Sequence, residues 1–245
     1  MSDQRSHCHP REYLHQTLTT KHGDLILLLC YLITGLLDSS SILLWGSFVS
    51  MQTGNTVYLG LGLAGAESQR WVKSGLSIAS FCIGSLVFGW FYRFFSPRKR
   101  WVLCVSFAVQ MVCIIVAAVI VTLRPTQDNT DKDISFLPLA LVAFQSSGQA
   151  VSSGVLGFKG LPSVVLTSIF CEFMASPLFL TRKMWSSFEE RRRLAAILSL
   201  TIGTVAGGLW ARSPAGVAGA LWTAAIIKGG IIVAWMGWRE ERITL

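Results

Sequence analysis

Charged residues are scarce in this sequence, and two long segments contain none. Only 14% of the 245 residues are Asp, Glu, Lys or Arg, whereas 52% are hydrophobic. Ser74–Tyr92 and Trp101–Leu123 carry no charge, and Leu25–Phe48 carries a single acid. Runs of about 20 apolar residues are typical of membrane-spanning helices. A soluble protein of this length could hardly bury so many uncharged runs, which argues against a soluble fold.

Histidine is missing from the whole apolar region. All four histidines lie in the N-terminal tail, at His7, His9, His15 and His22. The sequence also has no Ser-His-Asp set, no metal-ligand cluster and no phosphate-binding loop. We therefore expect neither an intramembrane enzyme nor a bound cofactor or metal ion. His7-Cys8-His9 could bind a metal, but its spacing matches no closed zinc site, and a disordered tail is the favoured interpretation.

Two other common features are absent. None of the six cysteines forms a Cys-x-x-Cys pair, and five lie within apolar runs, where a thiol behaves as a small hydrophobe. A disulfide framework is therefore not indicated. Residues 1–24 contain no apolar stretch like that of a cleavable signal peptide. We expect them to form a flexible, polar cytosolic tail.

The net charge is +8, which in a soluble protein would suggest a nucleic-acid partner. Here the basic residues stand mostly in the loops between apolar runs. Membrane proteins concentrate Lys and Arg in their cytoplasmic loops. The charge therefore indicates membrane topology, and we expect the lipid bilayer as a partner and no nucleic acid.

The apolar runs predict an all-α, polytopic membrane helix bundle with about six spans and two shorter membrane-inserted segments. The spans are expected at about 25–46, 71–92, 101–123, 134–157, 194–211 and 215–238, and the short segments at 53–66 and 163–180. A 14-residue helix covers only about 21 Å, less than a bilayer core of roughly 30 Å. The short segments are therefore expected to enter the membrane without crossing it.

A weak internal repeat divides the chain into two halves. Gly35, Ser39, Ser40 and Leu43 recur 113 residues later as Gly148, Ser152, Ser153 and Leu156, and Thr53 recurs 114 residues later as Thr167. We expect a tail (1–24), a first membrane half (25–123), a polar loop (124–133), a second membrane half (134–238) and a short tail (239–245). Three spans per half would give the two halves inverted topology, a common plan of transporters.

The number of spans depends on the two short segments. If both are re-entrant, the protein has six spans, and the basic loops Pro97–Arg100 and Arg182–Arg193 both lie on the side of the termini. If both cross, it has eight. Either arrangement places both termini in the cytosol by the positive-inside rule. The six-span arrangement is preferred because it explains both basic loops.

One stretch carries a family resemblance. Gly35-x-x-Asp38 is followed by Phe48-Val49-Ser50-Met51-x-Thr53-Gly54-Asn55-Thr56-Val57. This pattern resembles the YoaK-like family of uncharacterised multi-pass membrane proteins, over about residues 24–238. In the second half the family would have another Thr-Gly, but Thr167-Ser168 stands there. The resemblance implies about six spans and a membrane location, and it implies no activity.

Three ionisable residues lie deep in apolar surroundings: Asp38, Glu172 and Lys228. A charged side chain at such a depth costs roughly 2.5 kcal/mol or more unless it is paired or faces a polar cavity. Two interpretations follow. The residues form a functional site, or they form a structural ion pair of Lys228 with Asp38 or Glu172.

Polar residues accompany these groups. Thr53, Asn55 and Thr56 could cap a short helix or face a polar substrate. Gln145 and Gln149 stand four apart on one helix face, where they could line a polar path or bond to a neighbouring helix.

These residues predict a polar cavity between the halves, walled by Asp38, Thr53, Asn55, Gln149 and Glu172. The broken helices and buried acids favour a secondary transporter of a small polar or anionic solute. The alternative is a non-transporting membrane protein that scaffolds or regulates a partner through its basic cytosolic loops. The sequence identifies neither the solute nor an oligomeric state.

Overall fold

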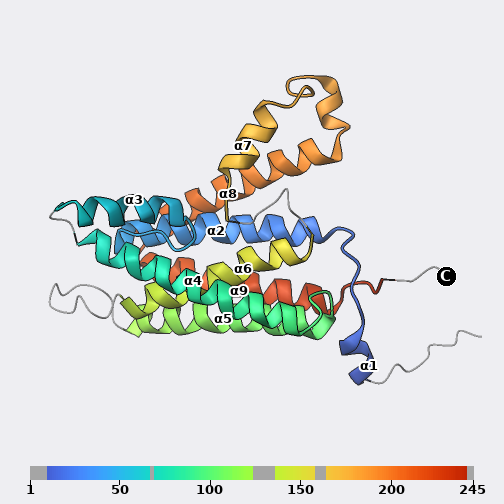
Figure 1. The fold of residues 1–245 in the computed structure, drawn as a ribbon, viewed down its shortest axis with the longest axis horizontal. Coiled ribbons are helices and arrows are strands. Elements are labelled where there is room, and N and C mark those ends of the chain that lie inside the picture. Colours follow the sequence, from blue (N-terminus) through green and yellow to red (C-terminus); the bar gives the residue numbers. More distant parts are fainter. Residues whose placement is uncertain (1–9, 67–68, 124–135, 158–163, 242–245) are drawn as a thin grey trace, which may run out of the picture.

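The computed structural model describes residues 10–66, 69–123, 136–157 and 164–241, and every regular element in these ranges is a helix. Figure 1 shows long helices lying side by side in a bundle. The elements are α1 (Pro10–His15), α2 (Gly23–Trp45), α3 (Gln52–Leu63), α4 (Arg70–Phe94), α5 (Arg100–Leu123), α6 (Phe136–Val155), α7 (Thr167–Met174), the 3₁₀ helix η2 (Arg182–Trp185), α8 (Phe188–Arg212) and α9 (Gly216–Met236). The predicted polytopic all-α bundle is confirmed. The expected loop 124–133, His7-Cys8-His9 and the break at 159–162 lie outside the described residues.

Five of these helices are long and apolar enough to cross a membrane: α2, α4, α5, α8 and α9. The sixth long helix, α6, has 20 residues, but its second half is rich in Gln and Ser. These polar residues, among them Gln145, Gln149 and Ser152, are buried inside the bundle. The chain is thus a multi-pass membrane protein, and α6 is the long helix of the described structure that lacks a stretch apolar enough to cross a membrane by itself.

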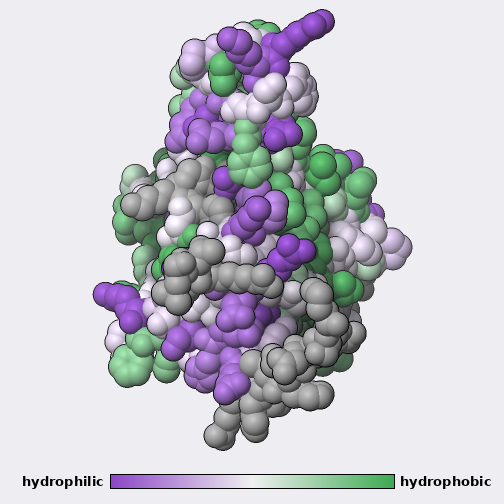
Figure 2. All heavy atoms as spheres, turned by 90° about the vertical axis from the view of Figure 1, so that its right-hand side faces the viewer, coloured by the Kyte–Doolittle hydropathy of each residue, from purple (hydrophilic) through white to green (hydrophobic). Residues whose placement is uncertain are grey.

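The outward faces of the long helices are apolar. Exposed apolar side chains recur there at helical spacing. On α5 they are Val105, Val109, Val112, Val116 and Val119, and on α8 they are Leu198, Ile202, Val205 and Leu209. The end of the bundle that carries α1 and the last turn of α9, which we call the tail end, is different. Figure 2 faces this end and shows many hydrophilic residues over it, with hydrophobic residues toward the flanks. This distribution suits a bundle whose flanks contact lipid.

The helices of the two expected halves pack mainly across the boundary between them. The first long helix of each half lies against the second long helix of the other, so that α2 packs on α8 and α6 packs on α4. The third pair, α5 and α9, also pack together. Separation into two independent lobes would break the largest contacts in the molecule.

Glycines allow both crossings to be close. A Cβ on Gly35 of α2 would lie 2.1 Å from the Leu200 carbonyl oxygen of α8. A Cβ on Gly84 of α4 would lie 2.2 Å from Ser147 Oγ of α6, and one on Gly148 would meet the Phe88 ring at 2.7 Å. Small residues permit such close contact of membrane helices. Gly35 and Gly148, which the repeat matches, therefore occupy corresponding crossings.

The two short segments differ from each other. The first forms α3, close to the prediction. In the second, α7 ends at Met174, short of the predicted residue 180, because Pro177 disfavours helix for the residues before it. The following helix, α8, begins six residues earlier than predicted, at Phe188, where Ser187 Oγ accepts the Glu190 N–H.

The described part of the N-terminal tail, residues 10–24, is folded onto the bundle, which corrects the prediction of a flexible segment. Leu18 is buried, and its N–H donates to the Arg98 carbonyl at 2.8 Å. We call residues 10–24 the strap, and Arg100 is buried beneath it. Its guanidinium donates to the carbonyls of Trp235 and Met236 at the end of α9, and lies 4.0 Å from the Tyr13 ring centroid. A cation at a helix C-terminus is favourable, so Arg100 joins α5, α9 and the strap.

Neighbouring glycines on α8 test the α2–α8 crossing. A Cβ on Gly207 would lie 2.1 Å from Ser39 Oγ, whereas one on Gly208 would meet nothing within 4 Å. Gly207→Ala should destabilise the protein by roughly 1–3 kcal/mol through overpacking. Gly208→Ala should leave stability unchanged or raise it slightly. Thermal unfolding of the purified variants in detergent measures both, and equal unfolding temperatures would contradict the close crossing.

Candidate functional site

A fully buried lysine lies in the middle of the bundle. Lys228 is near the centre of α9, and its side chain is 0% exposed. Its Nζ donates to Gln110 Oε1 of α5 at 2.6 Å and to Gln149 Oε1 of α6 at 2.8 Å. The Phe107 ring centroid lies 5.0 Å from Nζ, within cation–π range. We call Lys228, Gln110, Gln149 and Phe107 the lysine cluster.

Gln149 extends the lysine cluster to a fourth helix. Its Nε2 donates to the Cys30 carbonyl oxygen at 2.9 Å and to Thr34 Oγ1 at 2.8 Å, both on α2. A carbonyl oxygen can only accept, so this contact fixes the orientation of the amide and turns its oxygen toward Lys228. Four helices thus meet through one chain of hydrogen bonds.

The predicted pairing of Lys228 with Asp38 or Glu172 is wrong. Within the described ranges, no carboxylate forms an ion pair with the Lys228 ammonium; its polar partners are the two neutral amides. The pairing failed because the two acids are used elsewhere. Asp38 binds backbone N–H groups, and Glu172 pairs with Arg193.

Asp38 holds the turn between α2 and α3, residues 46–51, which we call the re-entrant turn. Its carboxylate accepts the backbone N–H groups of Val49 and Ser50, each at 2.9 Å, and the Ser50 hydroxyl. Asp38 lies seven residues before the end of α2. The chain therefore turns back along α2 before α3 begins, which places Val49 and Ser50 beside the interior of α2. The acid replaces hydrogen-bond partners that water would otherwise supply.

Asn55 holds the same turn from the other side. Its Oδ1 accepts the Phe48 N–H and the Ser47 hydroxyl, each at 3.0 Å, and its Nδ2 donates to the Phe48 carbonyl at 2.8 Å. Ser77 of α4 also donates to that carbonyl, at 2.7 Å. Asn55 is fully buried, so its contacts are with the protein's own backbone and with α4.

The remaining predicted residues take other places. Thr53 and Thr56 are exposed, and Thr56 Oγ1 donates to the Gln52 carbonyl, so neither caps the N-terminus of α3, whose N-cap is Met51. Gln145 lies one turn before Gln149 on α6 and is buried. Its Nε2 donates to Ser146 Oγ at 3.0 Å, and its Oε1 has no hydrogen-bond partner among the described residues.

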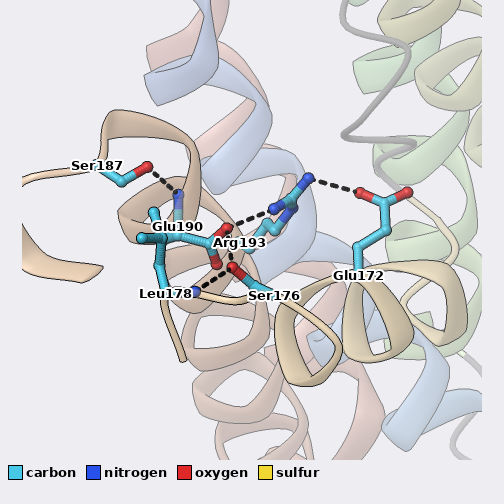
Figure 3. Close-up of polar contacts among 6 residues, drawn as sticks. All are labelled: Glu172, Ser176, Leu178, Ser187, Glu190 and Arg193. Atoms are coloured by element: carbon cyan, nitrogen blue, oxygen red, sulfur yellow. Dashed lines mark hydrogen bonds and ion pairs between the residues drawn. The ribbon is translucent and has the colours of Figure 1, made fainter. Parts of the chain in front are cut away.

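Glu172 lies in a side lobe, which we define as residues 167–193. Its carboxylate pairs with Arg193 at 3.1 Å, and Arg193 also pairs with Glu190 at 2.6 Å. Figure 3 shows these contacts with Ser176, which donates to Glu190 at 2.9 Å. The Glu172 side chain is 45% exposed, so it does not lie deep in apolar surroundings as predicted.

The predicted site residues therefore fall into three places. Gln149 and Lys228 meet in the lysine cluster, Asp38 and Asn55 meet at the re-entrant turn, and Glu172 is on the side lobe. The first two places are neighbours, because Thr34 and Asp38 stand one turn apart on α2. Sequence reasoning missed Gln110, although it is the only amide in the uncharged run of α5.

The lysine cluster combines three kinds of chemical group. It offers one cationic donor, two amides and an aromatic face. No set of three His, Cys, Asp or Glu residues that could hold a metal ion occurs in the described part of the chain. The arrangement suits recognition of a small polar or negatively charged group through charge-assisted hydrogen bonds.

The contacts of Asp38 predict a structural role. Asp38→Ala should leave two buried N–H groups of the re-entrant turn without acceptors, at about 1–3 kcal/mol each. Thr53→Ala, an exposed position in the next segment, should have little effect. Unfolding temperatures of both purified variants measure the difference. A wild-type unfolding temperature for Asp38→Ala would show that the turn does not depend on this carboxylate.

Comparison with known proteins assigns the chain to a family. A family model described as a protein of unknown function, DUF1275, matches residues 26–234. No curated protein and no solved structure matches the chain. The matched range contains the re-entrant turn, the lysine cluster and the side lobe. With nearly its whole length matched, the chain belongs to the DUF1275 family of uncharacterised proteins.

Proposed function

We propose that this protein is a secondary transporter of a small anionic solute, and that Lys228 is the charge that binds the solute. The observation that carries the proposal is the environment of Lys228. The ammonium is fully buried at the middle of a membrane helix, and its partners are two neutral amide oxygens and a ring. A transported anion would supply the missing negative charge.

The energetics support this interpretation. A protonated lysine in a water-free interior costs several kcal/mol unless a counter-charge is present. Hydrogen bonds to the two amides use two of its three N–H donors and leave the charge uncompensated. A buried charge that served only to hold helices together can often be replaced, along with its partners, by apolar residues at little cost. Binding of a charged solute would explain why a lysine, and not an apolar residue, stands at position 228.

The surroundings can also contribute to binding. Gln110 and Gln149 contact Lys228, and Gln145 lies one turn before Gln149 on α6, so three amides lie in or beside the cluster. Amide N–H groups and an ammonium together recognise a carboxylate or a small inorganic anion. Because the cluster is closed here, binding requires a second conformation that opens it to one side.

The architecture is compatible with such a conformation. The cross-packing of α2 with α8 and of α6 with α4 is what two interleaved halves would produce. Many transporters combine repeated halves with short helices that begin inside the membrane, and they bind solutes near the midplane. We further propose that the tail end, with Arg93, Arg98, Lys99 and Arg239, faces the cytosol.

Transport can be measured in proteoliposomes. Currents on a solid-supported membrane should appear on a rapid change to chloride, nitrate, acetate, lactate or phosphate, for at least one of these anions. Lys228→Met should lower that response by roughly tenfold or more, since a hydrogen bond to a charged group contributes about 1.5–3 kcal/mol. Lys21→Met, an exposed lysine at the tail end, is the matched control.

Two outcomes would contradict the proposal. One is an equal anion response in wild type and Lys228→Met. The other is no response to any anion in folded wild-type protein. The second result would favour the alternative, a membrane scaffold that acts through its basic surface, and no catalytic activity is part of either proposal.

A further inference from the structure

The side lobe extends from the bundle and is held together by its own packing and ion pairs. Figure 1 shows α7 and the first turns of α8 projecting sideways from the other helices. Its base is apolar, with Ile169 of α7 packed against Tyr31 of α2 and Ala196 of α8. Its interior is held by the Glu172–Arg193–Glu190 ion pairs and by Ser176. A surface on this lobe is therefore presented in a fixed shape.

The outer surface of the lobe exposes large apolar side chains. Leu180 is 84% exposed, Trp185 62% and Phe188 51%. Leu180 also has a left-handed backbone, with φ of 61°, which is unfavourable for a leucine. The turn before η2 thus holds an apolar side chain outward in a strained conformation. Phe188 is partly covered by the Arg192 guanidinium, 5.1 Å from its ring centroid, whereas Leu180 and Trp185 are the most open of the three.

Basic residues alternate with these apolar ones. Arg182 and Lys183 stand between Leu180 and Trp185, and Arg191 follows Phe188. All three are exposed, and none forms an ion pair with the described part of the molecule. The neighbouring Arg192 and Arg193 face inward instead, toward Asp24 and toward Glu172 and Glu190. With Glu189 as the acid beside them, this surface is net positive.

We propose that this surface binds the headgroups of anionic phospholipids at the membrane interface beside the bundle. Tryptophan, phenylalanine and leucine side chains favour the boundary between headgroups and acyl chains. Arg182, Lys183 and Arg191 then lie at the level of the phosphates, which attract cations near a charged bilayer. The sideways projection of the lobe places it over lipid and away from the bundle's own end. The inference does not depend on transport.

Native mass spectrometry can count lipids bound to the purified protein. Titration with phosphatidylglycerol and with phosphatidylcholine of the same acyl chains gives the two affinities. We expect wild type to prefer phosphatidylglycerol. The triple variant Arg182→Gln, Lys183→Gln, Arg191→Gln should lose phosphatidylglycerol affinity by roughly tenfold or more, toward its phosphatidylcholine value. Trp185→Ala should weaken both lipids, since it removes the apolar anchor.

A charge-matched control separates this site from general attraction. The triple variant Lys21→Gln, Arg93→Gln, Arg239→Gln removes the same charge from exposed residues outside the lobe and should keep the preference. An equal loss in both triple variants would overturn the proposal. Full displacement of the lipid by glycerol phosphate would also overturn it, by assigning the surface to a soluble phosphate. Displacement by an acidic peptide alone would assign it to a protein partner.

Discussion

The hydrogen bonds from the Lys228 ammonium to two glutamine oxygens are the constraint on which the centre of this structure depends. A lysine at that depth needs acceptors, and the acceptors come from α5 and α6, while Gln149 also binds α2. These side chains can meet only if the helices cross closely. Glycines make two further crossings close: Gly35 and Gly203 where α2 meets α8, and Gly84 and Gly148 where α4 meets α6. Helices α2 and α6 therefore take part both in the polar centre and in a close glycine crossing.

Much of the fold could be predicted, because uncharged runs define membrane helices by length alone. The runs at 71–92 and 101–123 became α4 and α5 almost residue for residue. The partners of the buried charges could not be predicted in this way. Those partners depend on which helices pack together. Helix α5, for example, packs on α9, which lies far from it in the sequence. Glu172 was misplaced for a local reason: Ser187 and Glu190 extend α8 at its start and bring Arg193 beside the acid.

Asp38 and Lys228 are both buried and ionisable, but they have different roles. The role of Asp38 is structural, since its carboxylate accepts backbone N–H groups of a turn that bends back beside α2. Lys228 has no such backbone partner in the described structure. The contrast explains why a cation, and not an acid, is central to the proposed binding of a solute. It also separates the residues that hold the re-entrant turn from the residue that would bind the solute's charge.

The most direct test of this account is the unfolding temperature of purified wild type and Lys228→Met, titrated with chloride, nitrate, acetate, lactate or phosphate at constant ionic strength. The account predicts that at least one anion raises the unfolding temperature of wild type and leaves that of Lys228→Met unchanged. It also predicts that the variant loses stability in every buffer, by roughly 1–3 kcal/mol for each glutamine oxygen left buried without a donor. An anion that raises both unfolding temperatures equally, or wild type that responds to none of the five anions, would contradict it.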